Sequence, residues 1–219
     1  MLRKLPIVAV LGQGSEITAG RASLAREAGA MIARLGAHLL TGGGYGVMEA
    51  ATEGFVAVSG RAGFSVGIVP RDPGGPLDRP NRDELGRAYP NSFVEIAILT
   101  PLPPRTENWR EQPARNHVNI FTADALLALP GNAGTRNELD MAAHYRGEAE
   151  RPRAVRRTVL LGPAEEFTPA HRDLFVHAET IAGAERQLRS VLAPHGFDLP
   201  SAKDEIEVDA RWVRGEAGL

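Results

Sequence analysis

The chain has 219 residues, of which 43% are hydrophobic and 24% charged, a composition typical of a globular protein rather than of a disordered segment. Its 25 Lys and Arg and 27 Asp and Glu leave a net charge of -2, which gives no reason to expect nucleic acid or an anionic membrane as a partner. Cysteine is absent, so disulfides, cysteine-ligated zinc, iron–sulfur clusters and thiol catalysis are excluded.

Short apolar runs alternate with helical stretches along the chain. Strands are expected at residues 7–11, 37–41, 63–69, 93–99, 125–129 and 158–161, and helices at about 19–35, 47–59, 114–121, 135–146 and 181–192. Because these strand runs are largely apolar, they are expected to be buried on both faces, as in a parallel sheet covered by helices. The pattern therefore predicts a doubly wound α/β fold with a mainly parallel sheet, a Rossmann-like three-layer sandwich.

The domain organisation follows from the same pattern. We interpret residues 1–219 as a single domain with its core at about 6–195 and a charged tail at about 201–219. Residues 70–92 and 100–113 are rich in proline and charge, and are expected to be long surface loops in which the choice of ligand is set.

The surroundings of the protein are also constrained by sequence. The apolar runs are far shorter than the roughly 20 residues that span a bilayer, so no membrane partner is expected. We interpret the basic start of the chain as leading into the first strand rather than as a signal peptide, which makes the cytoplasm the default compartment. A locally basic stretch at 151–157 is interpreted as a solvated loop.

Three glycine-rich turns each follow a predicted strand directly. They are Gly12-Gln-Gly-Ser15, Gly42-Gly-Gly-Tyr-Gly46 and Gly131-Asn-Ala-Gly-Thr135. The carboxyl ends of parallel strands meet at one edge, where the first amides of the following helices attract anions. Glycine lets the backbone approach a phosphate closely, and Ser15 and Thr135 can add hydroxyl donors and cap their helices. The turns predict an anion site, whereas the absence of G-x-G-x-x-G and G-K-[ST] disfavours an NAD enzyme or an NTPase.

Two charged residues are candidates for chemistry near these turns. Glu138 lies early in the helix after the third turn, where it either complements the helix dipole or acts as an acid, a base or a hydroxyl acceptor. Arg115 either forms a surface ion pair or provides a guanidinium fork for phosphate or for the charge of a leaving group. Patterning alone does not decide between these roles.

Other candidates point mainly to structure. The histidines are dispersed without a zinc-protease spacing, so no metal site is expected. Ser15 lacks the G-x-S-x-G context of a serine-hydrolase nucleophile. Met48 is expected to pack in the core or to line an apolar wall, and Asp124 to cap or orient the strand that follows it.

Two motifs carry a family resemblance. The segment Thr41-Gly-Gly-Gly-Tyr-Gly-Val-Met48 resembles the G-G-G-x-x-G-x-M element of the Lonely Guy (lysine-decarboxylase-like) Rossmannoid family. Pro130-Gly-Asn-Ala-Gly-Thr-Arg-Asn-Glu138 resembles the P-G-G-x-G-T-x-x-E element of the same family, and the turn from Gly12 to Ser15 resembles its first glycine–serine turn. Arg115 stands 23 positions before Glu138, as the catalytic arginine and glutamate do in that family.

The resemblance implies a homodimer that hydrolyses a nucleoside 5′-monophosphate to free base and ribose 5-phosphate, without a required cofactor. Arg115 and Glu138 would then be catalytic at the ribose and the glycosidic bond, where a carboxylate stabilises an oxocarbenium ion and a cation assists the departing base. The residues expected to bind the phosphate or line the site are Gly12, Gly14, Ser15, Gly42, Gly43, Gly44, Gly46, Met48, Asn116, Pro130, Gly131, Asn132, Ala133, Gly134 and Thr135.

Three departures from the enzyme pattern favour an alternative. Asn132 replaces the second glycine of P-G-G, the second glycine turn is one residue shorter, and Arg115 lies in Ala-Arg-Asn116 instead of the usual Met-His-x-Arg-Lys. The last of these resembles a sister branch that includes the molybdenum-cofactor carrier proteins, which bind a phosphorylated pterin. The sequence therefore leaves two functions open, a phosphoribohydrolase, slightly favoured by the presence of both Arg115 and Glu138, and a non-catalytic carrier or sensor of molybdenum cofactor or another phosphorylated ligand.

Two further functions are less favoured. A DNA-processing scaffold is disfavoured by the near-neutral charge. A pyridoxal phosphate decarboxylase needs a Schiff-base lysine, and neither Lys4 nor Lys203 is well placed.

Overall fold

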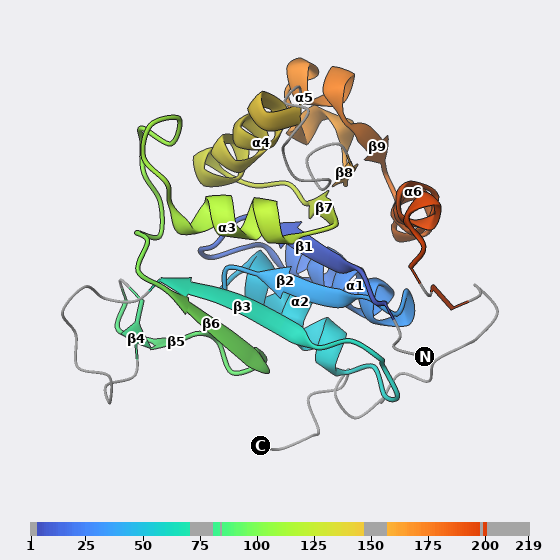
Figure 1. The fold of residues 1–219 in the computed structure, drawn as a ribbon, viewed down its shortest axis with the longest axis horizontal. Coiled ribbons are helices and arrows are strands. Elements are labelled where there is room, and N and C mark those ends of the chain that lie inside the picture. The colour runs from blue at the N-terminus through green and yellow to red at the C-terminus, as the bar shows by residue number, and fades with distance from the viewer. Residues whose placement is uncertain (1–3, 71–80, 84, 147–156, 198, 201–219) are drawn as a thin grey trace.

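A seven-stranded parallel sheet forms the centre of the protein in the computed structural model, which describes residues 4–70, 81–83, 85–146, 157–197 and 199–200 (Figure 1). The strand order is β6-β3-β2-β1-β7-β8-β9, and every neighbouring pair is parallel. The strands are β1 (Ile7–Leu11), β2 (His38–Thr41), β3 (Ser65–Pro70), β6 (Ile96–Thr100), β7 (Ala125–Ala128), β8 (Thr158–Leu161) and β9 (Val176–Ala178). The predicted doubly wound, parallel α/β fold is confirmed.

Helices cover both faces of this sheet (Figure 1). They are α1 (Ala19–Arg34), α2 (Val47–Val56), α3 (Arg115–Thr122), α4 (Ala133–Arg146), α5 (Pro169–Leu174) and α6 (Ile181–Leu192), with short 3-10 turns η2 (Ala164–Glu166) and η3 (Ala193–His195). The helices α1, α2 and α6 pack on one face, and α3 and α4 on the other. Among the described helices, none is long and apolar enough to cross a membrane.

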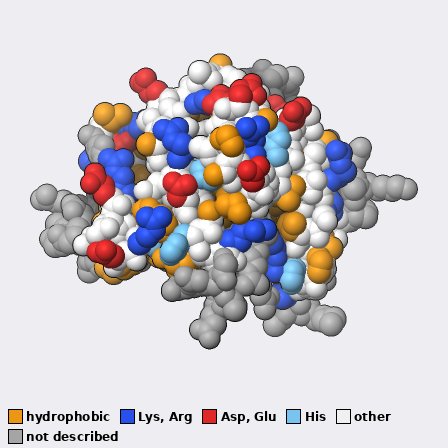
Figure 2. Space-filling view, turned by 90° about the horizontal axis from the view of Figure 1, so that it is seen from above, with side chains coloured by type: hydrophobic (Ala, Val, Ile, Leu, Met, Phe, Trp, Pro, Cys, Tyr) orange, Lys and Arg blue, Asp and Glu red, His pale blue; other side chains and the backbone are white. Residues whose placement is uncertain are grey.

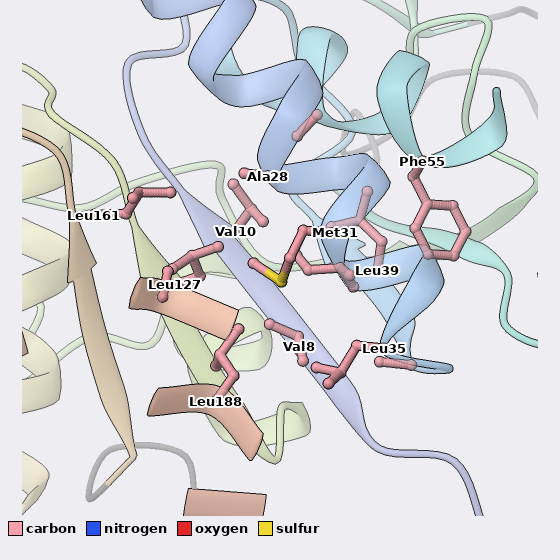
Figure 3. Close-up of a cluster of buried hydrophobic side chains, with 14 of the residues drawn as sticks. Val8, Val10, Ala28, Met31, Leu35, Leu39, Phe55, Leu127, Leu161 and Leu188 are labelled. Atoms are coloured by element: carbon pink, nitrogen blue, oxygen red, sulfur yellow. The ribbon is translucent and has the colours of Figure 1, made fainter. Parts of the chain in front are cut away.

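The core on the α1 face is built from alternate residues of the central strands. Met31 of α1 points toward Val8 and Val10 of β1, and Leu127 of β7 and Leu188 of α6 belong to the same buried cluster (Figure 3). All five side chains are at most 2% exposed. Burial of each such side chain contributes on the order of 1.5–3 kcal/mol, so this cluster holds α1 and α6 firmly against the sheet.

The strand order reverses between β1 and β7, which places a topological switch point at the carboxyl edge of the sheet. From β1 the chain adds strands outward through β2, β3 and β6, and then returns to the other side of β1 with β7, β8 and β9. Because the connections leave β1 and β7 toward opposite faces, the loops beyond these two strands diverge there, which is where ligands bind in open α/β sheets. Asp124 bridges the two strands at their other end: its Oδ2 accepts from the Ile7 amide at 3.0 Å, and its own amide donates to the Ile7 carbonyl at 2.7 Å.

One strand differs from its prediction. The run at 93–99 was expected to be buried on both faces, but β6 starts at Ile96 and is the exposed edge of the sheet. Ile96, Ile98 and Leu99 are 42%, 45% and 55% exposed. The apolar run was correctly identified as a strand, but no described helix covers it.

Three further differences concern short elements and one helix end. The loop predicted at 70–92 contains a two-stranded hairpin of β4 (Asn81–Arg82) and β5 (Ala88–Tyr89), and β9 was not anticipated. The second predicted helix ends at Val56, three residues before its predicted end. The predicted basic loop, apart from its last residue, and the predicted tail at 201–219 lie outside the described residues.

Candidate functional site

The first two glycine turns pack directly on each other at the carboxyl edge. Gly46 has a φ of +67°, and a Cβ there would collide with the carbonyl oxygens of Gln13 and Ser15. The Val47 amide donates to the Gln13 carbonyl at 2.9 Å. A Cβ on Gly12 would in turn collide with the Val47 side chain. Gly12 and Gly46 are therefore needed for contact between the turns, in addition to any role with a ligand.

The first turn is fixed by side chains rather than by a Ser15 cap. Helix α1 starts after Thr18, whose hydroxyl accepts from the Arg21 amide at 3.3 Å, so the prediction that Ser15 caps this helix is wrong. Three residues separate Ser15 from the helical start, and its hydroxyl instead accepts from Gln13 Nε2 at 3.3 Å. Arg21 donates to Gln13 Oε1 at 2.8 Å, which ties the turn to α1.

The second turn is held by residues that the sequence analysis did not single out. Asn91 Nδ2 donates to the Gly44 carbonyl at 2.6 Å, and the Asn91 amide donates to the Gly43 carbonyl at 2.8 Å. The hydroxyl of Tyr89 donates to the Gly42 carbonyl. Because the Gly43 amide donates to Thr41 Oγ1 at 3.0 Å, that amide is already satisfied within the protein. Only the tertiary structure reveals these partners, since they lie more than forty residues apart in sequence.

Met48 lies between the first two turns. A Cβ on Gly14 would come 3.0 Å from Met48 Cε, and a Cβ on Gly44 would come 2.6 Å from it. The partly buried side chain of Met48 thus lies against the backbone of both turns.

Arg115 is the first residue of α3, and its guanidinium reaches across to the second turn. A Cβ on Gly42 would overlap Arg115 Nη1, so the guanidinium rests directly on the backbone of that glycine. The Arg115 amide donates to the Pro103 carbonyl at 2.8 Å. Just ahead of it, the Ala114 amide donates to His117 Nδ1 at 3.0 Å, and this ring also bonds the Trp109 carbonyl at 2.9 Å. These contacts fix the start of α3 and the loop before it.

The third turn is capped by Asn132 instead of Thr135. Asn132 Oδ1 accepts from the Gly134 amide at 3.0 Å, and the Asn132 carbonyl accepts from the Arg136 amide at 3.1 Å. Thr135 lies inside α4, so the prediction that it caps this helix is wrong. Its side chain is 3% exposed, and Oγ1 is buried without a hydrogen-bond partner in the described part of the chain. A Cβ on Gly131 would overlap that hydroxyl.

Glu138 lies one turn further along α4, close enough to Arg115 for that positive charge to affect the pKa of its carboxyl group. Burial raises the pKa of Glu138 to about 7, although the positive charge of Arg115 opposes this rise. Burial also raises the pKa of Tyr89, and Arg115 again opposes the rise. The structure therefore brings Arg115 near both Glu138 and Tyr89. Its guanidinium makes no short ion pair with Glu138 among the described contacts.

Among the described residues, four of the five buried side-chain polar atoms without a hydrogen-bond partner lie on the two helices that carry this pair, and the fifth is Arg61 Nε. The four are Arg115 Nε, Asn116 Oδ1 and Asn119 Oδ1 on α3, and Thr135 Oγ1 on α4. Buried polar groups are nearly always hydrogen-bonded, so each of these exceptions calls for a bound molecule or ordered water. Asn119, which is 2% exposed, was not anticipated because an asparagine inside a helix carries no motif. In the described residues, no group of three His, Cys, Asp or Glu side chains is arranged to hold a metal ion.

The sequence comparisons agree with this geometry. A family model for the SLOG cluster4 family matches residues 5–149, which is more than half of the chain. The chain belongs to the SLOG cluster4 family. The wider SLOG superfamily includes the Lonely Guy proteins, so the predicted relationship is confirmed. An uncharacterized protein of Archaeoglobus fulgidus is 30% identical over 139 residues, covering 64% of this chain and 74% of that protein.

Two solved structures resemble this SLOG cluster4 protein over most of its length. The Moco carrier protein from Chlamydomonas reinhardtii is 28% identical, with a TM-score of 0.62 over 87% of this chain and 99% of that one. The molybdenum cofactor binding protein from the phototrophic bacterium Rippkaea orientalis is 25% identical, with a TM-score of 0.61 over 86% of this chain and 98% of that one.

Proposed function

We propose that this SLOG cluster4 protein binds a small phosphorylated molecule in the crevice between the second and third glycine turns. The observation that carries the proposal is the hydroxyl of Thr135, which is buried without a hydrogen-bond partner in the described residues and lies on the helix that carries Glu138. A guanidinium and a hydroxyl are donors that phosphate oxygens satisfy. The carboxyl group of Glu138 can accept from a hydroxyl of the same ligand.

The phosphate itself is assigned to the third turn. Helix α4 has 14 residues, and the first amides of a helix have no acceptor inside it. Those of Ala133 and Thr135 can donate to phosphate oxygens, and the helix dipole adds to the attraction. Gly131 leaves room for the Thr135 hydroxyl at the same point.

The ligand class that we favour is a phosphorylated pterin, with the protein acting as a carrier. Two structures at 25–28% identity are named for molybdenum-cofactor carriage or binding, and each is covered almost completely. A carrier needs donors for the phosphate and a shaped crevice, but no group that must gain or lose a proton during turnover. The comparison thus shifts the balance away from the hydrolase that the sequence slightly favours.

Calorimetry tests this proposal. Purified protein is titrated with molybdenum cofactor, with AMP and with inorganic phosphate, and we expect the pterin to bind more tightly than the other two. Arg115→Met should weaken all three, since each shares the phosphate group. Absence of binding by any of them, or unchanged binding by Arg115→Met, contradicts the proposal.

The second candidate is a phosphoribohydrolase, which the placement of Glu138 favours. A carboxyl whose pKa is about 7 can change its protonation state near neutral pH, as acid–base catalysis requires. Release of free base from a panel of nucleoside monophosphates, measured by chromatography, tests it. We expect turnover to rise as the pH increases through about 7, because an oxocarbenium ion needs the ionised carboxylate. Release that survives Glu138→Ala excludes this mechanism.

We propose a homodimer because the edge strand β6 exposes apolar side chains. Its exposed Ile96, Ile98 and Leu99 form an apolar edge, which natural sheets usually cover or interrupt with charge. Pairing of β6 with the same strand of a second copy satisfies both the edge amides and the apolar side chains. Light scattering should give twice the chain mass for the wild type and the monomer mass for Ile98→Lys. The control Leu174→Lys changes another exposed apolar residue, 39% exposed on α5, and should leave the dimer intact.

Nucleic acid is not proposed as a partner. Lys and Arg side chains are interspersed with Asp and Glu on the face shown in Figure 2, without merging into one basic surface. Sequence-independent binding to nucleic acid depends on such a surface and weakens with salt. Salt-sensitive retention of an oligonucleotide at low ionic strength would contradict this expectation.

A further inference from the structure

The third turn already provides an acceptor for one of its own amides, the side chain of Asn132. Asn132 Oδ1 accepts from the Gly134 amide at 3.0 Å, so a neutral carbonyl oxygen sits where an oxygen of a bound anion would otherwise accept. A glycine at this position would leave that amide open to the crevice. The chain therefore has one fewer donor available for phosphate than the fold allows.

Thr135 supports a ligand site at this turn by an observation that does not depend on the helix N-terminus. Its side chain is 3% exposed, and its hydroxyl lies against Gly131 without a partner in the described region. That hydroxyl is one turn before Glu138 on α4, on the helix that meets Arg115. The turn thus holds one amide that Asn132 satisfies and one hydroxyl that no described residue satisfies.

We propose that Asn132 competes with the ligand phosphate for the Gly134 amide and thereby sets the strength of the phosphate subsite. This inference rests on the proposed phosphate site. The Asn132 side chain must turn away before all the first-turn amides can donate, so binding of a bare phosphate is weakened. Larger phosphorylated ligands lose affinity by the same factor, so the ratio between their affinities and that of free phosphate stays the same.

Two substitutions separate this role from an ordinary helix cap. Asn132→Gly frees the Gly134 amide, and we expect inorganic phosphate to bind about tenfold more tightly, the order of one hydrogen bond to a charged group. Asn132→Asp keeps the cap but adds a negative charge at the anion position, so phosphate should bind more weakly than to the wild type. The control Thr180→Gly removes a cap of the same kind from α6, where Thr180 Oγ1 accepts from the Gly183 amide at 3.1 Å. It should leave phosphate affinity unchanged.

The amide signal of Gly134 gives a second readout. In a nitrogen-15 correlation spectrum of the wild type, saturating phosphate should shift this signal, because its acceptor changes from Asn132 to the ligand. In Asn132→Gly the signal should start elsewhere and shift at lower phosphate concentration.

The outcomes distinguish failure of this inference from failure of the proposed function. If the wild type binds phosphate and Asn132→Gly binds it equally or more weakly, Asn132 is a ligand-binding donor or a plain cap, and the inference is wrong while the site stands. If only Asn132→Gly binds, the competition is supported. If neither binds phosphate nor a larger phosphorylated ligand, both the inference and the proposed function are wrong.

Discussion

The guanidinium of Arg115 occupies the space that a side chain on Gly42 would fill. A Cβ built on Gly42 overlaps Nη1 of Arg115, although the two residues are 73 positions apart. The absence of one methyl group at the end of β2 is therefore what lets α3 place a cation beside Glu138. This contact couples the second glycine turn to the charged pair.

Gly42→Ala should separate these charges without removing either of them. The new methyl group displaces the guanidinium, so we expect phosphate-ligand affinity to fall by roughly 10- to 100-fold, the value of one or two charge-assisted hydrogen bonds. The control is Gly20→Ala in α1, where no atom lies within 4 Å of the added Cβ. It should leave binding unchanged and raise stability by about 0.5–1 kcal/mol. Equal affinities in all three proteins, measured by calorimetry, would show that Arg115 does not contact the ligand.

The raised pKa of Glu138 makes a prediction about stability. Below pH 4.5 the carboxyl is protonated in both folded and unfolded chains, and between 4.5 and about 7 only the folded chain keeps its proton. The unfolding free energy contributed by this residue therefore falls as pH rises through that window, and the loss is complete above about 7. Glu138→Gln carries no such loss, so it should be more stable than the wild type by about 2–3 kcal/mol at pH 8 and equal to it at pH 4.

Urea unfolding at a series of pH values measures this difference, and Glu95→Gln provides the opposite case. Glu95 bonds Arg61 and the Ser65 amide, and these hydrogen bonds lower the pKa of its carboxyl. Its contribution to stability is present above the unfolded pKa and is lost on acidification. Glu95→Gln should therefore destabilise the protein at pH 8. A Glu138→Gln variant that is also destabilised there would mean that the ionised carboxylate has a stabilising partner.

The long elements were predictable because their apolar periodicity is local. Strands β1, β2, β7 and β8 fall within their predicted runs, since each is a short apolar segment followed by a turn. Strand β9 was missed because it has only three residues, with the polar His177 in the middle. The prediction that β6 is buried on both faces was wrong, because the sequence of an apolar strand does not show whether helices of its own chain or another molecule cover it.

The site was predictable only in part. The motifs identified Arg115 and Glu138, but no motif indicates that Gly42 makes room for the guanidinium. It also missed Tyr89 and Asn91, because hydrogen bonds from a distant hairpin to backbone carbonyls leave no pattern in a single sequence. The predicted helix caps were wrong for a local reason. A hydroxyl beside a glycine turn suggests a cap, but the residue at which the helix begins determines which side chain caps it.

Tyr89 is predicted to position the second turn rather than to bind ligand through its own hydroxyl. It donates to the Gly42 carbonyl, so Tyr89→Phe should loosen Gly42 and with it Arg115. We expect stability to fall by about 1–3 kcal/mol, since the buried carbonyl loses its donor. Ligand affinity should fall as well.

Tyr45→Phe is the matched control for this substitution. Tyr45 also bonds the β4–β5 hairpin, since its hydroxyl donates to the Ala88 carbonyl at 2.6 Å. Its ring, however, lies under the guanidinium of Arg87. It should lower stability without changing phosphate affinity. If both variants change affinity alike, the hairpin as a whole, and not the contact between Tyr89 and Gly42, holds the site.

Thr135 and Thr52 offer a comparison of two buried hydroxyls, each on a helix that follows a glycine turn. The Thr52 hydroxyl has acceptors for its one proton in the Met48 carbonyl at 2.9 Å and Asn91 Oδ1 at 3.2 Å, whereas Thr135 Oγ1 has no described partner. Valine has the same shape, so Thr52→Val removes one hydrogen bond and should cost about 0.5–1.5 kcal/mol, while Asn91 Oδ1 still accepts from the Phe93 amide. Thr135→Val removes a hydroxyl whose burial is uncompensated, so it should leave the unliganded protein equally stable or more stable by up to about 1 kcal/mol. Its cost should appear only with ligand, as a roughly tenfold loss of phosphate affinity.

Thermal unfolding with and without phosphate measures both effects. A Thr135→Val protein that is less stable without ligand would mean that ordered water already satisfies the hydroxyl, and the argument for a phosphate at this turn would lose its main support.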